Sequence, residues 1–431
     1  MKWRQAAIAL TILSVSLLAA TGAGAQNLSN GGPTKAAQPI SPNWFAMHVV
    51  SQSSPWPSTV GVPFSSWRTV SANIKWSDIN TSPGVYDWTY FDRWMSEISA
   101  NGQSILYTMY YTPSWASQCP ACVCNEGTQA PGGCYPPNDL NSDGTGTDQH
   151  LKDFVTALMQ HVGPGKIQYI EIWNEPNIPS EYAGTVQQLV SMARDVRQIA
   201  QSFDPNVKIT SPPETGDGKH STQMTYLGQY LGAGGGNYVD VIGMHGYVQN
   251  PEDIVTRVNA ATADMQQYGQ SSKPLFITEG SWCCDTAPIP AAQQPGFSFR
   301  LELVQLSTPV QKFYLYAYDS DMEGNLWNVT TGKLTAVGTA YQLSYNWLVG
   351  ATMTQACQAQ SGTSPIWSCT FTKPGGYQAE AIWDTALPQG GGTTSVAVGT
   401  QYIQYRDLYG KVYKISNHKV PAGFDPIWLE N

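Results

Sequence analysis

Eight short apolar segments alternate with amphipathic helical segments between residues 42 and 350, and this alternation predicts an α/β protein built on a (β/α)8 (TIM) barrel. Beyond residue 350 the helical periodicity ends, and short β-rich segments separated by glycine and proline follow. Residues 351–431 are therefore predicted to form a small antiparallel β-sandwich-like domain. A length of 431 residues with 42% hydrophobic content suits one large domain and one smaller domain.

The barrel strands are predicted where aliphatic, β-branched and aromatic residues form short runs. These runs are Trp44–His48, Trp67–Val70, Ser104–Tyr110, Ile167–Trp173, Val207–Ser211, Val239–Met244, Leu275–Thr278 and Lys312–Tyr318. Helices are predicted where apolar residues recur with helical spacing, at Thr89–Ala100, Asp148–His161, Thr185–Ser202, Thr222–Leu231, Pro251–Tyr268, Gly296–Leu306 and Thr335–Val349. The breaks expected at helix ends are supplied by Gly163-Pro164-Gly165, by Asp204-Pro205 and by the glycine run that begins at Gly232.

The second domain is predicted from alternating β-rich segments at Ile366–Phe371, Gln378–Trp383, Thr394–Val398, Gln401–Tyr405 and Lys411–Ile415. Residues 26–41 form an N-terminal segment that is a candidate for one more strand of this domain. We expect the domain to stabilise the barrel by packing against it. Carbohydrate binding is the alternative role.

Residues 1–25 have the features of an export signal. Lys2 and Arg4 precede an apolar stretch over residues 6–20, and a small-residue Ala-Gly-Ala site follows at 23–25. Because the stretch is short for a membrane span, a secreted or periplasmic protein is predicted, with an uncleaved N-terminal anchor as the alternative. A net charge of -9 argues against nucleic acid and anionic membranes as partners.

Eight cysteines in an exported protein are expected to form disulfides. Cys357 and Cys369 flank a turn and are predicted to pair with each other. The other six are Cys119, Cys122, Cys124 and Cys134 in one loop, and Cys283 and Cys284 in another. The last two are expected to brace their loop by pairing outward, with the four-cysteine loop as a candidate partner. A zinc site in that loop is the alternative, although the spacing is not that of two Cys-x-x-Cys knuckles.

Two of the predicted strands end in a carboxylate. The fourth runs through Tyr169-Ile-Glu-Ile-Trp-Asn174-Glu175-Pro176, and the seventh runs through Leu275-Phe-Ile-Thr-Glu279-Gly280. In this fold the carboxyl ends of the strands form the face that carries catalytic groups. A retaining glycosidase needs two such carboxyl groups facing one another. We therefore predict Glu175 as the acid/base and Glu279 as the nucleophile, with an oligo- or polysaccharide as substrate.

Other side chains near these strand ends are candidates for supporting roles. Arg68 ends the second strand and is placed to donate to Glu279, and Tyr247 is a second donor to the nucleophile. Asn174 is a candidate ligand of the sugar 2-hydroxyl. The remaining substrate-binding candidates are His245, Trp282, Trp327, Tyr111 and Trp115. A paired barrel charge or a core histidine is the alternative role for Arg68 and His245, and plain packing is the alternative for Trp115 and Trp327.

Three of these sequence motifs resemble those of a known group of enzymes. Trp-Asn174-Glu175-Pro, His245-x-Tyr247 and Thr-Glu279-Gly resemble the retaining (β/α)8 glycoside hydrolases of clan A. The Tyr-Thr-Pro-Ser-Trp segment at 111–115 and the trailing β-domain make the chain most similar to family 39, the β-xylosidase-like group, with family 5 second. The resemblance covers about residues 42–431 and implies the roles already given to Glu175 and Glu279. The cysteine-rich segment 116–148 departs from it, so sugar, linkage and exo or endo cleavage stay open.

Other interpretations have specific tests. A sugar-binding barrel without turnover would lack one carboxylate, and an endo-acting glycanase of another family of the clan would differ in its products. A metal-dependent hydrolase would need a richer ligand set than six histidines offer.

Residues 139–144 match the first half of a calcium loop, but His150 stands where a bidentate Glu is needed. Glu214 and Asp319 are reserve carboxylates. No cofactor and no metal are predicted, and the oligomeric state is left open.

Overall fold

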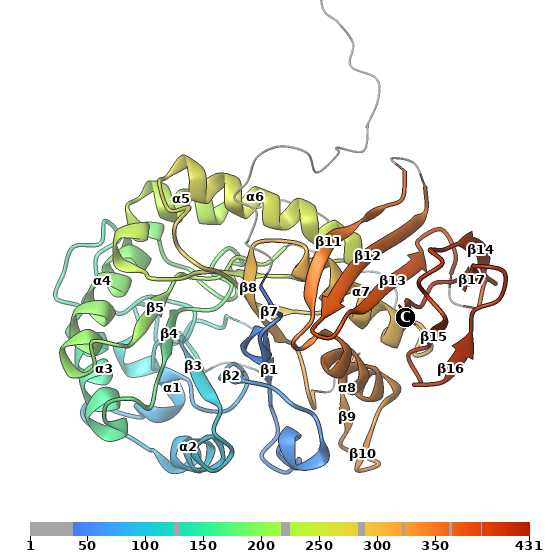
Figure 1. The fold of residues 1–431 in the computed structure, drawn as a ribbon. Coiled ribbons are helices and arrows are strands. Elements are labelled where there is room, and N and C mark those ends of the chain that lie inside the picture. Colours follow the sequence, from blue (N-terminus) through green and yellow to red (C-terminus); the bar gives the residue numbers. More distant parts are fainter. Residues whose placement is uncertain are drawn as a thin grey trace, which may run out of the picture.

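The structure, a computed structural model, describes residues 38–124, 130–216, 225–282, 289–320, 324–361, 364–388 and 390–431. Its larger part is a barrel of parallel strands surrounded by helices (Figure 1). The strands are β1 (Phe45–His48), β2 (Ser66–Arg68), β3 (Ser104–Met109), β4 (Tyr169–Ile172), β5 (Lys208–Thr210), β6 (Ile242–His245), β7 (Leu275–Gly280) and β8 (Val310–Leu315).

The strands pair in the order β5-β4-β3-β2-β1-β8-β7-β6, so only β5 and β6 lack a continuous ladder between them. Two single parallel bridges, Thr210 to Val241 and Glu214 to Met244, link these last two strands and close the ring. The predicted (β/α)8 barrel is therefore confirmed.

The helices that cover the barrel begin and end close to their predicted positions. They are α1 (Trp76–Ile79), α2 (Thr89–Asn101), α3 (Gln149–Val162), α4 (Val186–Phe203), α5 (Tyr226–Gly232), α6 (Ile254–Gln267), α7 (Gln294–Leu306) and α8 (Ala336–Leu348). Thr185 caps α4 by accepting a hydrogen bond from the Gln188 amide, while the Gln188 side chain accepts from the Thr185 amide. The single turn α1 was not predicted, because four residues carry no helical periodicity.

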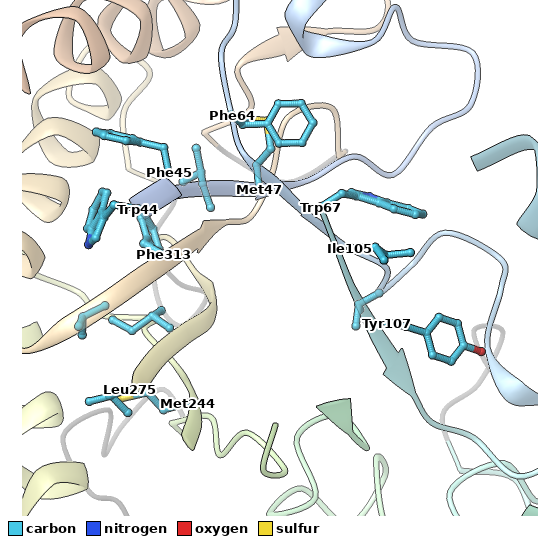
Figure 2. Packing of buried hydrophobic residues seen from close by; sticks show 14 of the residues in the cluster. Trp44, Phe45, Met47, Phe64, Trp67, Ile105, Tyr107, Met244, Leu275 and Phe313 are labelled. Carbon is cyan, nitrogen blue, oxygen red and sulfur yellow. The ribbon is translucent and has the colours of Figure 1, made fainter. Parts of the chain in front are cut away.

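Short elements fill the connections between strands and helices. The 3-10 turns are η1 (Pro42–Trp44), η2 (Pro57–Val60), η3 (Ser114–Ala116), η4 (Gly235–Tyr238) and η5 (Pro251–Asp253). The small hairpin of β9 (Trp327–Asn328) and β10 (Lys333–Leu334) follows β8. A continuous hydrophobic core lies between strands and helices, and Figure 2 shows part of it around Met47, Trp67 and Phe313.

The barrel interior is layered. A separate apolar cluster includes one residue each from β1, β3, β7 and β8 and the residue before β6: Ala46, Leu106, Phe276, Tyr314 and Val241. Ser66 and Tyr314 hydrogen-bond across it at 2.9 Å. Charged side chains of β2, β4 and β7 belong to the next part of the interior, toward the carboxyl ends of the strands. The apolar cluster thus supports a polar centre above it.

The predicted antiparallel domain is also confirmed. Its strands are β11 (Thr352–Ala359), β12 (Ile366–Lys373), β13 (Tyr377–Asp384), β14 (Thr394–Ala397), β15 (Gln404–Arg406), β16 (Val412–Lys414), β17 (Lys419–Ala422) and β18 (Ile427–Glu430). Six of them form a sheet in the order β11-β12-β13-β18-β15-β16, and β14 pairs with β17. A small core that includes Ile382, Val396 and Leu429 joins the two sheets. Strands β11, β17 and β18 were not predicted.

The β-domain lies against α7 and α8 of the barrel (Figure 1). The indole of Trp428 stacks on that of Trp347, with centroids 5.6 Å apart and planes 14° apart. Trp383 Nε1 donates to Glu252 Oε1 at 2.8 Å, and the Arg300 guanidinium donates to both oxygens of Glu252. This shared core and buried ion pair favour the stabilising role over an independent module.

We expect Trp428→Ala to destabilise the whole chain by about 3–5 kcal/mol, because a fully buried indole that joins both parts would be replaced by a cavity. Chemical denaturation followed by tryptophan fluorescence and far-UV circular dichroism measures the free energy of unfolding. Trp367→Ala is the matched control, since this partly exposed indole stacks only within the β-domain, on Trp383. Equal losses in the two variants would contradict the interface role of Trp428.

The described cysteines form three disulfides. Cys357 pairs with Cys369 as predicted, Cys119 pairs with Cys122, and Cys124 pairs with Cys134. The zinc alternative for the loop is therefore wrong, since all four thiols are oxidised. The suggested link from this loop to Cys283 or Cys284 is also wrong, because each loop cysteine already has a partner. Cys283 and Cys284 themselves lie outside the described residues.

The predicted export signal lies outside the described residues. Of the N-terminal segment 26–41, residues 38–41 are described, and they contain no strand. Ile40 exchanges two backbone hydrogen bonds with the start of the β-domain, donating to Ala351 at 2.8 Å and accepting from Gly350 at 2.9 Å. Within the described ranges, the helices are too short or too polar to cross a membrane.

Candidate active site

Glu175 and Glu279 lie together at the carboxyl ends of β4 and β7. Glu279 is within β7, and Glu175 follows β4 by three residues. A carboxylate oxygen of each residue and an imidazole nitrogen of His245 all lie within 4.8 Å of one another. The side chains are 17% and 9% exposed for Glu175 and Glu279, so both remain accessible from the mouth of the barrel. Two carboxyl groups remote in sequence are therefore close in space.

Local backbone geometry turns Glu175 toward this centre. Trp173 and Glu175 have φ of 64° and 45°, a left-handed conformation that non-glycine residues adopt only when their surroundings hold them there. The Trp173 amide donates to the Met109 carbonyl at 2.9 Å, and its indole donates to the Glu181 carbonyl at 2.8 Å. The alternation of β4 thus ends at Trp173, and the turn that follows directs the Glu175 side chain toward this centre.

Arg68 is the central cation of the site. Its Nη1 donates to Glu279 Oε2 at 2.6 Å, its Nε donates to Glu171 Oε2 at 2.7 Å, and its Nη2 donates to Asn174 Oδ1 at 2.8 Å. Thr108 donates a further hydrogen bond to Glu171 at 2.9 Å. Arg68 and Glu171 are fully buried. Glu171 is therefore the paired structural charge, and Arg68 fixes both Glu279 and Asn174.

Tyr247 and His245 reach the carboxylates from the end of β6. Tyr247 donates to Glu279 Oε1 at 2.6 Å, so each oxygen of Glu279 accepts a hydrogen bond. His245 Nδ1 lies 2.7 Å from Glu175 Oε1. Burial lowers the pKa of His245 to about 3, against the opposing charge of Glu279, so the imidazole is neutral at ordinary pH. His245 is thus a neutral hydrogen-bond partner of Glu175.

Burial raises the pKa of Glu175, while a hydrogen bond from Thr215 and the charges of Arg68 and Arg257 oppose the rise. Removal from water is therefore the largest cause of the raised pKa of Glu175. A raised pKa keeps the carboxyl group protonated at higher pH, as a general acid requires.

The aromatic candidates divide into two groups. Tyr111 lies at the site, where its hydroxyl donates a hydrogen bond to Glu181. Burial is the largest cause of its raised pKa, the charge of Glu181 comes next, and Glu175 also contributes. Trp115 donates from Nε1 to the Asn80 carbonyl at 3.0 Å. Trp327 stacks on Tyr318 at 6.1 Å, and Trp282 packs edge-on against Phe297 at 5.2 Å. These contacts do not bring the three tryptophans to the carboxylates, and their sugar-binding role stays a prediction.

Two side chains of the site were not predicted. Glu181, in the loop after β4, accepts from Tyr111 and hydrogen-bonds with Asn174. Tyr316, just after β8, contacts His48 edge-on with ring centroids 4.9 Å apart, and burial and the nearby Glu279 raise its pKa to about 12. Tyr316 could have been predicted from its position directly after the eighth strand, whereas no sequence pattern marks Glu181 as a residue of the site.

The reserve carboxylates have structural partners. Glu214 accepts hydrogen bonds from the amides of Thr225, Tyr226 and Leu227, each at 2.9 Å, and so caps α5. Asp319 accepts from the amides of Val50 and Ser51 at 2.7 and 3.1 Å. Neither is needed for the catalytic pair.

The segment considered for calcium is held by its own hydrogen bonds. Asp139 Oδ2 accepts from Thr147 Oγ1 and from the Gln149 and His150 amides at the start of α3. Asp143 Oδ1 accepts from the Thr145 amide at 2.9 Å. In the described part of the chain, the group with spacing for a shared cation is Glu175, His245 and Glu279. There the Arg68 guanidinium already supplies a positive charge to Glu279, which leaves less need for a metal ion.

Comparison with known proteins gives a consistent result. Residues 144–341 match the family model described as glycosyl hydrolase catalytic core, a range that includes both Glu175 and Glu279. The chain is a glycoside hydrolase. A search of curated proteins returned no match.

Solved structures share the fold of the hydrolase. A family 39 glycoside hydrolase from Bacteroides cellulosilyticus aligns with a TM-score of 0.67 at 15% identity, covering 91% of this chain and 81% of that one. The family 39 enzyme of Xanthomonas axonopodis pv. citri gives 0.62 at 16% identity, covering 91% and 95%. A family 30 subfamily 8 xylanase from Clostridium acetobutylicum gives 0.58 at 14%, covering 92% and 97%. The hydrolase thus shares with these enzymes the fold that the sequence predicted.

We expect Arg68→Met to lower the free energy of unfolding of the hydrolase by about 3–5 kcal/mol, because Glu171 would be left as a buried charge without its cation. Chemical denaturation measures the loss. Arg406→Met is the matched control, since its pair with Glu430 is about one-third exposed on the arginine side and is expected to contribute about 0–1 kcal/mol. A small effect at Arg68 would mean that Glu171 is neutral in the folded state.

Proposed function

We propose that the hydrolase cleaves β-linked glycosides or polysaccharides with retention of anomeric configuration, with Glu175 as acid/base and Glu279 as nucleophile. The observation that carries this proposal is the approach of the two carboxyl groups, whose oxygens lie within 4.8 Å. Retaining enzymes have carboxyl groups about 5–5.5 Å apart, whereas inverting enzymes leave about 6.5–9.5 Å for a water molecule. The spacing favours direct attack on the sugar.

In the first step, Glu279 attacks the anomeric carbon while Glu175 gives its proton to the departing glycosidic oxygen, and the bond between that carbon and oxygen breaks. The hydrogen bonds from Arg68 and Tyr247 hold both oxygens of Glu279 in place. The raised pKa of Glu175 provides the proton. Asn174, fixed by Arg68, is our candidate partner of the sugar 2-hydroxyl.

In the second step, the Glu279 ester carries no charge, so the pKa of Glu175 falls and its carboxylate can accept a proton from water. That water attacks the anomeric carbon and releases Glu279. His245 contacts one oxygen of Glu175 and stays neutral in both steps, which fits a role in orienting the carboxyl group.

We further propose residues 42–350 as the catalytic barrel, residues 351–431 as an accessory domain, and export from the cytoplasm. Three disulfides among the described residues support an oxidising compartment. The substrate class follows from the reaction: an oligo- or polysaccharide with a β-linked sugar. Structurally similar proteins include enzymes described as a glucosidase, a β-xylosidase and a xyloglucanase.

The proposal is tested by a screen of aryl β-glycosides and plant polysaccharides with analysis of the products. Proton NMR of the first product formed shows its anomeric configuration, and product lengths separate exo from endo cleavage. We expect a β-configured first product. An α-configured first product would overturn the retaining mechanism, and sugar binding without hydrolysis across the screen would favour the non-catalytic barrel.

A further inference from the structure

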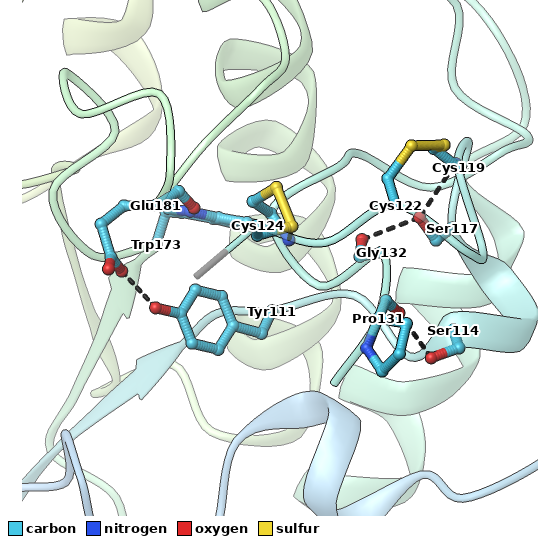
Figure 3. Close-up of a disulfide and its surroundings, with 11 residues drawn as sticks. Tyr111, Ser114, Ser117, Cys119, Cys122, Cys124, Pro131, Gly132, Trp173 and Glu181 are labelled. Carbon is cyan, nitrogen blue, oxygen red and sulfur yellow. Dashed lines mark hydrogen bonds between the residues drawn. A yellow bond between two sulfur atoms is a disulfide. The ribbon is translucent and has the colours of Figure 1, made fainter. Parts of the chain in front are cut away.

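A third carboxyl group, that of Glu181, belongs to the same centre. It lies in the loop that follows β4, and the charges of both Glu175 and Glu279 act on it. The Tyr111 hydroxyl donates to Glu181 Oε2 (Figure 3), and the Asn174 side chain makes a second hydrogen bond with the Glu181 carboxyl group. Asn174 therefore bridges Arg68 and Glu181, which fixes the orientation of its amide.

The position of Glu181 is built into the fold. Tyr111 has φ of 61°, a left-handed conformation that its surroundings must hold. The Thr112 amide donates to the Gly133 carbonyl at 3.0 Å, and the Ala183 amide donates to the Cys134 carbonyl at 2.8 Å. The disulfide between Cys124 and Cys134 closes this segment beside both residues (Figure 3). One cross-linked loop thus supports the Tyr111 side and the Glu181 side together.

We propose that Glu181 is a positioning residue of the centre, which, in its ionised form, helps to retain the proton on Glu175 and holds the Asn174 amide toward the substrate. This inference rests on the proposed function, because it acts through the acid/base. Burial raises the pKa of Glu181, and the hydrogen bonds that Tyr111 and Asn174 donate to its carboxyl group oppose that rise. Its negative charge then opposes a second negative charge on Glu175.

The direction of the effect follows from reciprocity. Burial is the largest cause of the raised pKa of Glu181, and the charge of Glu175 adds to it. An interaction between two sites acts equally on both. Whichever group loses its proton first, an ionised Glu181 can only increase the proton occupancy of Glu175. The other charged or titratable groups facing the pair are Arg68, Arg257, His245, Tyr247, Tyr110, Tyr111 and Glu279. None of them changes in the Glu181 variants used for the kcat/KM profile, whereas Tyr111→Phe and the Glu279→Gln background of the NMR titration each change one.

Glu181→Gln and Glu181→Ala separate the two roles. Glutamine removes the charge but keeps an oxygen that can accept from Tyr111 and Asn174, whereas alanine removes both. With a poor-leaving-group β-glycoside, which requires protonation, we expect the basic limb of the kcat/KM profile of Glu181→Gln to move by about half a pH unit or more toward lower pH. Glu181→Ala should show the same shift and a lower kcat. Tyr111→Phe should move the limb in the same direction by less.

Glu97→Gln, which removes the charge of an exposed residue on α2, is the matched control and should leave the profile unchanged. A second measurement needs no turnover: 13C NMR titration of the Glu175 carboxyl carbon in a Glu279→Gln background, with and without Glu181→Gln. A lower pKa for Glu175 in the double variant is expected. An unchanged limb and an unchanged titration in folded protein would overturn the role of Glu181. If the wild-type enzyme shows no hydrolysis, or if its basic limb survives Glu175→Gln, the proposed function itself has failed.

Discussion

Replacing Glu279 by alanine is expected to lower kcat/KM by at least about 10⁴-fold on every substrate, because in the proposed mechanism Glu279 is the group that forms the glycosyl-enzyme bond. Arg68 would keep its hydrogen bonds to Glu171 and Asn174, so the variant should fold. The space left by the side chain would admit a small anion from the face that Glu279 occupies. Azide should therefore restore turnover and yield a glycosyl azide of inverted, α configuration.

Stereochemistry makes this result specific to Glu279. Anomeric assignment of the azide product by NMR identifies the face from which the anion attacked, and a thermal melt of the variant establishes that it is folded. Residual activity close to the wild type would mean that another carboxylate attacks the sugar. A folded but inactive variant that azide does not rescue would point to a substrate-binding role for Glu279.

Those parts of the site that follow from barrel topology could be predicted from the sequence. Parallel strands present their carboxyl ends at one face, so residues that end β2, β4, β6 and β7 must meet there. Arg68, Glu175, Tyr247 and Glu279 were predicted on this basis, and the structure brings them within hydrogen-bonding or near-contact distance. The two-residue period of a strand likewise places Glu171 and its apolar neighbours Ile170 and Ile172 on opposite faces of β4.

Loop residues could not be predicted in this way, because their positions depend on the path of the chain. Glu181 lies beyond the end of β4 in a segment without periodicity, and its contact with Tyr111 joins residues 70 positions apart. The pairing of Cys119 with Cys122 and of Cys124 with Cys134 depends on the same unpredictable path. Trp115 and Trp327 were chosen for lying near strand ends; the structure shows their contacts with Asn80 and Tyr318, and sugar binding by them stays a prediction.

The β-domain shows a similar limit. Strands with a clear alternation, such as β12 and β13, were predicted close to their observed bounds. Strand β11 exposes much of its Thr352–Ala359 surface and has little apolar alternation. Strand β17 contains Pro421, which argues against a strand by the ordinary rule. Segment Lys419–Ala422 is a strand because it pairs with β14 and contributes to the small shared core.

Replacing Glu175 by alanine is expected to lower kcat/KM in proportion to the basicity of the leaving group. Glycosides that need protonation should lose about 10²–10⁴-fold, the usual contribution of a positioned acid. Aryl glycosides with very acidic phenols, such as dinitrophenol, depart without a proton and should form the glycosyl-enzyme at nearly the wild-type rate. Pre-steady-state release of the phenol measures this first step separately from hydrolysis.

Hydrolysis of the glycosyl-enzyme should then become limiting in Glu175→Ala, because no base activates water. Azide needs no base, so it should accelerate turnover and give a glycosyl azide with retained, β configuration, opposite to that from Glu279→Ala. The two variants share a fold and a substrate and differ in the anomer of the azide product, so each is the control for the other. Equal losses on activated and unactivated substrates would show that Glu175 is not the acid. His245, held neutral by burial, lies 2.7 Å from Glu175 and could not take over proton donation as an imidazolium.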